Sequence, residues 1–166
     1  MSKTKTTDFY LKKATKEDVP LILDFINALA KYEKLSDVVV ATEELLAETL
    51  FGECSYAEVL IGYEREVPAA FALFFHNYST FLARPGIYLE DLFVKPEYRR
   101  RGYGKVILSE LAKIAVERKC GRLEWAVLDW NTPAIEFYKS LGAVPMDEWT
   151  IFRLSGRALE RLGKSS

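Results

Sequence analysis

The first part of the chain combines one strand pattern with two helical patterns. Residues 9–13 are typical of a short strand, and residues 15–18 have the Thr-Lys-Glu-Asp sequence of a capping box. Apolar residues then recur at helical spacing over residues 21–30, and again over residues 45–51 after Thr42. We therefore expect one strand followed by two helices.

The rest of the chain predicts a β-meander and then alternating helices and strands. The first two strands of the meander should form a hairpin, because the segment between them is polar and ends in a proline, and a turn at residues 84–86 should precede the third. The expected strands are residues 56–63, 69–76, 87–94, 123–128 and 150–154. Helical patterns cover residues 106–115 and 133–141. This order predicts an α/β (α+β) fold, with a sheet of mixed direction and helices on both faces.

Composition places the chain among ordinary globular domains. It has 166 residues, of which 49% are hydrophobic and 28% are charged. We expect one domain over residues 8–162, with loose ends at residues 1–7 and 163–166. The formal net charge of −1 excludes the broad basic field that binding to nucleic acid or to an anionic membrane requires.

Cysteine and histidine are too scarce for several kinds of chemistry. Two cysteines, Cys54 and Cys120, and one histidine, His76, provide neither a disulfide framework nor a zinc site, so we expect no metal. A hydrolase is disfavoured because there is no Gly-x-Ser-x-Gly motif. The start of the chain lacks the apolar stretch of a secretory signal, and the longest apolar run, residues 69–75, is too short to span a bilayer. These features predict a cytoplasmic protein.

A basic turn is the first candidate for chemistry. Residues 95–105 contain five basic residues and one acidic residue, a local net charge of +4. The run Arg-Arg-Arg-Gly-Tyr-Gly at residues 99–104 lies between a predicted strand and a predicted helix, so its backbone amides can converge on a phosphate. It lacks the Gly-Lys-Ser/Thr of a Walker motif and the third glycine of a dinucleotide fingerprint. An ordinary solvated turn is the alternative.

Further motifs accompany the basic turn. Two carboxylates, Glu90 and Asp91, interrupt the apolar strand before it, and Asn-Thr-Pro-Ala begins a predicted helix at residues 131–134. The same helix continues into Phe-Tyr-Lys-Ser-Leu-Gly-Ala at residues 137–143. With Val-Lys-Pro-Glu-Tyr-Arg running into an Arg-x-x-Gly-x-Gly signature from residue 94, the chain resembles the GNAT superfamily of N-acetyltransferases. The resemblance implies a mostly antiparallel central sheet whose central strands splay apart.

Within this superfamily the chain is similar above all to the diamine and polyamine acetyltransferases of the spermidine/spermine type. The residues that carry this narrower resemblance are 29–33, 88–91, 129–131 and 148–149. It implies a small cationic acceptor and a homodimer. The segment between Ala143 and Trp149 is shorter than in the polyamine enzymes, so a different acceptor is a live alternative.

The resemblance also implies that acetyl-CoA binds between the two splayed strands. Its diphosphate would lie on the backbone amides of the basic turn, and its pantetheine would pair with the strand edge before that turn. The implied contacts are Leu92, Phe93, Val94, Arg99, Arg100, Arg101, Gly102, Tyr103, Gly104, Lys105, Asn131 and Ala134. Members of the family often carry glycine at the position of Arg100.

Acetylation of an amine needs a proton acceptor and a proton donor, because an alkyl amine is protonated at pH 7 and the expelled thiolate must be neutralised. Glu90 is the predicted acceptor, directly or through ordered water, since strand alternation places it on the same face as Leu92. An ion pair with a nearby basic residue is the alternative. Tyr138 matches the proton-donor tyrosine of the family. These roles predict direct transfer in a ternary complex.

Local charge predicts the type of acceptor. Residues 16–66 contain 12 acidic and 4 basic residues, and this excess of negative charge favours a cationic substrate. The candidate contacts for the amine are Tyr32, Glu33, Glu90, Asp91, Glu148 and Trp149. A diamine or polyamine is the first expectation. The alternatives are a lysine-like or thialysine-like amino acid, another small amine, or a non-catalytic protein that senses acyl-CoA.

Overall fold

The computed structural model describes residues 8–165, which form two compact units, one ending at Ala126 and the other beginning at Val127. Residues 1–7, expected to be a loose end, and Ser166 lie outside the described residues. No helix within residues 8–165 is long and apolar enough to cross a membrane.

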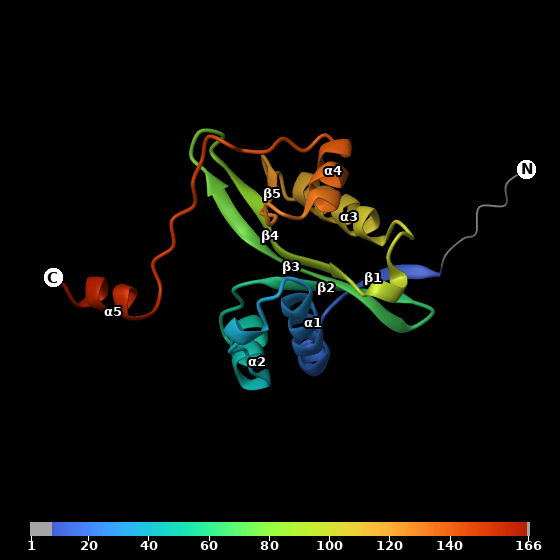
Figure 1. Ribbon diagram of the computed structural model, residues 1–166, viewed down its shortest axis with the longest axis horizontal. Helices are drawn as coiled ribbons and strands as arrows, with labels where there is room; N and C mark the ends of the chain where they lie inside the picture. Colours follow the sequence, from blue (N-terminus) through green and yellow to red (C-terminus); the bar gives the residue numbers. More distant parts are fainter. Residues whose placement is uncertain (1–7, 166) are drawn as a thin grey trace, which may run out of the picture. The chain divides into compact units, whose positions relative to one another are not determined.

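A five-stranded sheet forms the centre of the first unit (Figure 1). The strands follow one another in space as they do along the chain: β1 (Phe9–Lys13), β2 (Glu58–Glu64), β3 (Val67–Ser79), β4 (Arg84–Val94) and β5 (Leu123–Trp125). Neighbouring strands from β1 to β4 are antiparallel, and β5 is parallel to β4. The expected sheet, mixed and mostly antiparallel, is confirmed.

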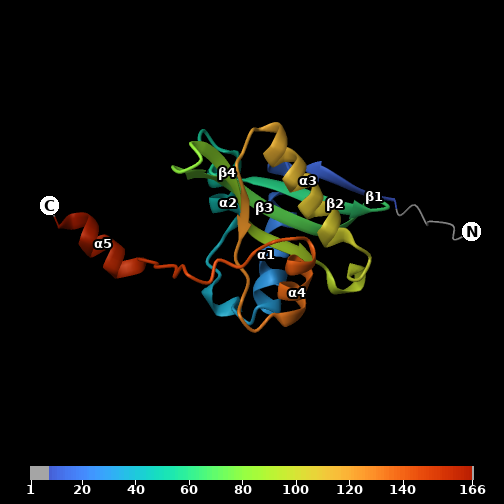
Figure 2. The ribbon, with the colours of Figure 1, turned by 90° about the horizontal axis from the view of Figure 1, so that it is seen from above.

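Helices cover both faces of this sheet. The helices α1 (Val19–Tyr32) and α2 (Glu43–Phe51) lie on one face, and α3 (Tyr103–Glu117) lies on the other (Figure 1). Figure 2 views the sheet from the side of α3. Short 3₁₀ turns occupy Lys16–Asp18, Ser36–Val38 and Pro96–Tyr98. The expected placement of helices on both faces is confirmed for this unit.

Local hydrogen bonds explain where the first two helical segments begin. The backbone N–H of Thr15 donates to Oδ2 of Asp18 at 2.8 Å, which forms the expected capping box ahead of α1. At the start of α2, Oγ1 of Thr42 accepts a hydrogen bond from the backbone N–H of Leu45 at 3.2 Å. Both expected helix starts are confirmed.

The core of the first unit lies between the sheet and the helices α1 and α2. Phe25 of α1 is 1% exposed, and its ring centre lies 5.0 Å from that of Phe71 on β3 and 6.5 Å from that of Phe93 on β4. Ile22 and Ile61 are fully buried in the same cluster. This packing fixes the position of Phe93, a residue on the strand edge that is expected to meet acetyl-CoA.

Strand β4 contains a bulge at Glu90. Leu89 and Asp91 pair with adjacent residues of β3, so Glu90 is an extra residue without a cross-strand partner on β3. The simple alternation expected along this strand is therefore wrong at this point. Because of the extra residue, Leu89 and Leu92 share one face of the sheet, while Asp91 and Phe93 share the face that α1 covers.

Pairing between β4 and β5 extends only from Ile87 to Leu89 on β4. Beyond this point no other strand within residues 8–165 pairs with that side of β4, so residues 90–94 form an open edge. This early separation confirms the expected splayed strands.

The strands β3 and β4 begin earlier than expected. The expected turn at residues 84–86 belongs to β4, and the chain reverses at residues 80–83 instead. Pro68 likewise lies within β3, after a tight turn formed by Arg65 and Glu66. Proline is tolerated near the first residue of a strand, where the ladder loses little from its missing N–H, and this explains both differences.

The second unit contains the helices α4 (Thr132–Ser140) and α5 (Gly156–Lys164). Oδ1 of Asn131 accepts a hydrogen bond from the backbone N–H of Ala134 at 3.4 Å. The helix start expected at Asn131 is therefore confirmed.

The segment between α4 and α5 differs from the sequence prediction. The strand expected at residues 150–154 is wrong, because a strand persists only where a neighbour completes its hydrogen bonds, and residues 127–165 contain no strand to do so. The sequence pattern also fails to predict α5, since Gly156 and Gly163 weaken its helical propensity. This helix includes two residues, Gly163 and Lys164, of the segment expected to be a loose end.

Replacing Phe25 by alanine should lower the free energy of unfolding by about 3–5 kcal/mol, because the substitution empties a packed site beside Phe71 and Phe93. Urea denaturation measures this loss. Phe81→Ala is the matched control: Phe81 is fully exposed, so its loss should change stability by about 0.5 kcal/mol or less. Equal losses in the two variants would contradict this assignment of the core.

Candidate active site

The basic turn between β4 and α3 presents backbone donors at the end of a helix. Gly102 immediately precedes α3 and has a φ of 83°, and Arg100 has a φ of 62°, so both residues adopt the left-handed conformation. Gly102, the N-cap residue, has no side chain to cap the first turn of α3, and the N–H groups of residues 103–105 have no acceptor within the helix. A helix end of this kind carries partial positive charge and binds anions.

Glycine keeps this helix end accessible. A Cβ at Gly102 or Gly104 would meet no atom of the described residues within 4 Å apart from its own chain neighbours and helix backbone, so a ligand can approach the main chain. A hollow of about 420 Å³ runs from Gly102 along α3, past Lys105, Ser109 and Lys113. The turn therefore has both the donors and the space for a phosphate group.

The three arginines of the turn have different environments. Nε of Arg99 donates to the carbonyl oxygen of Val94 at 2.9 Å. Arg101 donates to both carboxylate oxygens of Glu64, at 2.7 and 2.8 Å. Arg100 is exposed. The guanidinium groups of Arg99 and Arg101 are therefore already held by partners within the protein.

Three carboxylates gather near the start of the open edge of β4. Asp91 is half-buried, and this burial, together with the charges of Glu90 and Glu33, raises its pKa to about 6. Glu33 directly follows α1, and burial raises its pKa as well. The structure thus brings together three of the residues predicted to bind the substrate amine.

Aromatic rings border this group of carboxylates. The ring of Tyr32, the last residue of α1, lies 6.4 Å from the ring of Phe93. The guanidinium of Arg99 lies 4.5 Å from the ring centre of Tyr32 and 5.4 Å from that of Phe93. A cation of the protein itself therefore lies over the ring on which the sequence predicts a substrate ammonium.

The other predicted site residues belong to the second unit. Asn131 and Ala134 form the capped start of α4, and Tyr138 lies further along the same helix. Glu148 and Trp149 lie in the irregular segment after α4, and both are exposed. Three of the five residues are therefore fixed on one helix.

Two features of the site have no clear signal in the sequence. Burial causes most of the rise in the pKa of Asp91, and Glu90 and then Glu33, which is far away along the chain, add to it. The carboxylate that binds Arg101 comes from Glu64 at the end of β2, and nothing near the turn in sequence indicates it. For Asp91, the one local signal is its position beside Glu90 in an otherwise apolar strand.

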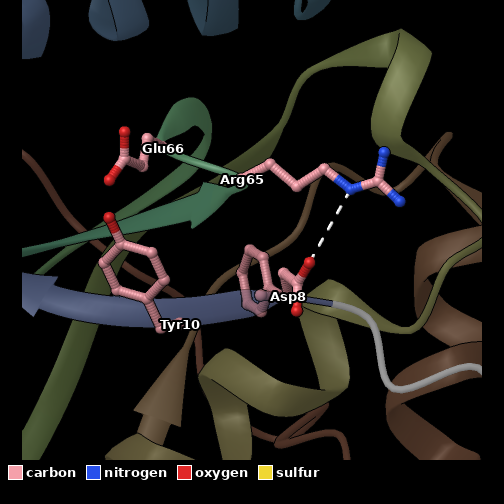
Figure 3. A pocket seen from close by; sticks show the side chains of 5 residues that line it. Asp8, Tyr10, Arg65 and Glu66 are labelled. Carbon is pink, nitrogen blue, oxygen red and sulfur yellow. Dashed lines mark ion pairs between the residues drawn. The ribbon is translucent and has the colours of Figure 1, made fainter.

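A second hollow lies at the edge of the sheet and contains none of the predicted site residues. Figure 3 shows this hollow, of about 520 Å³, lined by Asp8, Phe9, Tyr10, Arg65 and Glu66. Nε of Arg65 lies 3.8 Å from Oδ2 of Asp8, and both side chains are mostly exposed, so their ion pair stabilises little. Within residues 8–165 no group of His, Cys, Asp and Glu side chains is placed to hold a metal ion.

An open strand edge next to an anion-binding helix end suits a ligand that combines an extended amide chain with a diphosphate, as a coenzyme A thioester does. The model of the Acetyltransferase (GNAT) family matches residues 26–143, and the chain belongs to this family. The expected superfamily is confirmed, and with it an acyltransferase enzyme whose family uses acetyl-CoA as co-substrate.

Three relatives of this chain have names that state their substrates. The chain is 39% identical to the thialysine N-epsilon-acetyltransferase of Bos taurus, over 92% of this chain and 95% of that protein. It is 36% identical to an L-ornithine N5-acetyltransferase of Arabidopsis thaliana, over 93% of this chain and 87% of that protein. A human spermidine/spermine N(1)-acetyltransferase-like protein is 29% identical, but the match covers only 24% of it. The narrower resemblance to polyamine enzymes is thus supported only in part.

Solved structures agree with the observed fold. An integron cassette protein from the mobile metagenome of V. cholerae superimposes with a TM-score of 0.80 and 30% identity, over 95% of this chain and 99% of that one. The similarity therefore extends over almost the whole of both chains.

Replacing Asp91 by asparagine should stabilise the protein at pH 7 and weaken binding of a cationic acceptor. The pKa of Asp91 is raised to about 6 in the folded protein, so the ionised form opposes folding above that pH. A shift of roughly two pH units corresponds to about 3 kcal/mol and to a rise of several degrees in melting temperature. Thermal denaturation at pH 7 and the KM of the acceptor measure the two effects.

Denaturation near pH 4 is the control for this variant. The folded state binds the extra proton, so the stability contributed by Asp91 falls as pH rises from about 4 to about 6. The advantage of Asp91→Asn should therefore nearly vanish near pH 4. An advantage of the same size at both pH values would show that the charge of Asp91 is not its cause.

Proposed function

We propose that the protein transfers the acetyl group of acetyl-CoA to the terminal amine of a small cationic acceptor, first of all the side-chain amine of a lysine-like or ornithine-like amino acid. The observation that carries this proposal is the group of Glu33, Glu90 and Asp91 at the open edge of β4. Carboxylates attract an ammonium and can accept its proton. The names of the thialysine and ornithine relatives support the same class of acceptor.

An amino-acid acceptor differs from a polyamine because it carries a carboxylate. The guanidinium of Arg99 lies over Tyr32, whose neighbour in sequence is Glu33. A cation beside Tyr32, the residue that precedes Glu33, suits a zwitterion, since a guanidinium pairs well with a carboxylate. This arrangement favours an amino acid over the polyamine that the sequence alone puts first.

A diamine or polyamine is the second candidate. The three carboxylates also suit a substrate with more than one ammonium, and the spermidine/spermine-like relative points to such a substrate. The third alternative, a non-catalytic sensor of acyl-CoA, has less support because the named relatives are transferases.

The main chain of the first unit would provide most of the contacts to acetyl-CoA. The N–H groups of residues 103–105 would donate to its diphosphate, and the open edge at residues 92–94 would pair with its pantetheine. Arg100 and Lys105 would add positive charge, since both are exposed beside the helix end. The roles predicted for Asn131 and Ala134 in the same binding remain part of the proposal.

The proposed reaction moves two protons and forms no covalent intermediate with the protein. Ionised Asp91 or Glu90 accepts a proton from the substrate ammonium, and the neutral amine attacks the thioester carbonyl. A backbone N–H near Leu92 or Phe93 stabilises the oxyanion, which collapses and expels the thiolate of coenzyme A. The phenol of Tyr138 donates its proton to this thiolate, and the second proton of the substrate nitrogen, released as the amide forms, restores the phenol.

Release of free thiol from acetyl-CoA, measured with a panel of acceptors, tests the function. Thialysine, lysine and ornithine should give higher kcat/KM values than diamines or polyamines. Methyl esters of the same amino acids keep both amines and lose the carboxylate, so they serve as matched controls and should react more slowly if Arg99 binds that carboxylate. A higher kcat/KM for spermidine than for every amino acid would support the second candidate, and no thiol release with any amine would reject both.

Replacing Tyr138 by phenylalanine should lower kcat about a hundredfold or more, because the leaving thiolate loses its proton donor. The affinity for acetyl-CoA should change by less than about twofold, since the ring remains. Tyr56→Phe removes the same hydroxyl from an exposed residue and should leave kcat unchanged. An unchanged kcat in Tyr138→Phe would remove this residue from the mechanism.

Three further expectations accompany the proposal. They are a single acetyltransferase domain over residues 8–162, assembly as a homodimer and a cytoplasmic location, and all three remain predictions.

A further inference from the structure

Glu64 binds both neighbours of Gly102 in the basic turn. Its carboxylate accepts two hydrogen bonds from Nη1 of Arg101, at 2.7 and 2.8 Å, and a third from the hydroxyl of Tyr103. The side chain of Glu64 is only 17% exposed. Nη2 of Arg101 also donates to the carbonyl oxygen of Glu97 at 3.1 Å, within the same turn.

Tyr103 is held on its ring as well as on its hydroxyl. It is the first residue of α3 and is 2% exposed, and its ring stacks on that of Phe9 with ring centres 3.9 Å apart and planes 6° apart. Phe9 is the cross-strand partner of Glu64. A Cβ at Gly62 would lie 2.5 Å from the Phe9 ring, so this glycine allows the ring to lie close to β2. The edge formed by β1 and β2 thus fixes the first residue of α3.

We propose that Glu64 is a positioning residue for the binding of coenzyme A. Gly102 adopts a left-handed conformation, and the N–H groups that follow it form the anion site, so their direction depends on how the residues on each side are held. One carboxylate holds both of these residues, Arg101 and Tyr103. The inference rests on the proposed function, because the anion concerned is the diphosphate of acetyl-CoA.

In this role the positive charge of Arg101 acts on the ligand indirectly, through the order of the turn. The guanidinium of Arg101 is directed to Glu64, so its side chain serves to order the turn and the main chain provides the direct contacts. A turn that is already ordered loses less conformational entropy when the ligand binds. The Glu64 carboxylate therefore contributes to the affinity for an anion although it is itself negatively charged.

Glu64→Gln tests this inference, because glutamine keeps the size of the side chain and removes its charge. Calorimetric titration with coenzyme A should show about tenfold weaker binding, and the KM for acetyl-CoA should rise to a similar degree. The kcat at saturating acetyl-CoA and the KM of the amine should stay within about twofold of the original values. Tyr103→Phe should shift the affinity in the same direction by a smaller factor.

Glu58→Gln is the matched control. Glu58 lies at the other end of β2 and also binds an arginine through two hydrogen bonds, from Arg118 at 2.6 and 3.0 Å. Its replacement removes a similar ion pair far along the strand from the turn, so it should affect melting temperature without affecting affinity for coenzyme A. Equal weakening of binding in both variants, or unchanged binding in Glu64→Gln, would overturn the inference.

Hydrogen exchange of the unliganded protein separates this inference from the proposed function. In Glu64→Gln the amides of residues 100–105 should exchange faster, while exchange in the core strands stays unchanged. If the original protein gives no heat with coenzyme A, the proposed function fails, and the exchange rates still show whether Glu64 orders the turn. Unchanged exchange in this segment would reject the role of Glu64 directly.

Discussion

The separation of β5 from β4 after Leu89 is the constraint on which the candidate site depends. In a continuous sheet, the main-chain groups of residues 90–94 would be paired with a neighbouring strand. Within residues 8–165 no strand pairs with this side of β4, which is the arrangement that a ligand acting as a strand requires. The edge is nevertheless rigid, because Phe93 is buried against Phe25 and because β3 pairs with the other side of β4. A ligand that pairs with residues 90–94 would therefore meet main-chain groups that are already held in a fixed position.

Charge is divided between the two ends of this edge. Carboxylates meet at the bulge where the edge begins, and the basic turn follows where it ends. A cationic acceptor and an anionic co-substrate would thus be attracted to different ends of one short segment. Within the turn, Glu64 neutralises Arg101 and leaves the main-chain donors at the start of α3 to meet the anion. Side-chain charge therefore orders the basic turn through Glu64 and Arg101, whereas at the bulge it would attract the acceptor.

The sequence predicts the features that depend on local chemistry. The helix starts at Thr15, Thr42 and Asn131 follow from side chains that bond to nearby N–H groups, and the structure contains all three. Features that depend on contacts between residues far apart in the sequence cannot be predicted from local patterns. The expected strand at residues 150–154 lacks a neighbour, and the rise in the pKa of Asp91 comes mainly from burial in the folded protein, with a smaller contribution from Glu33 on another element. The hydrogen bonds between Glu64 and Arg101 are a further example, because they form only when the end of β2 lies beside the turn before α3.

The bulge at Glu90 also limits how this strand can vary through evolution. The extra residue sets the phase of the segment that follows, so that Phe93 enters the core while the carboxylate of Asp91 lies on the same face near Glu33. Loss or gain of one residue here would exchange the inward and outward sets of side chains between the bulge and the turn. Exchanges of one amino acid for another can be absorbed in this segment far more easily than a change in its length.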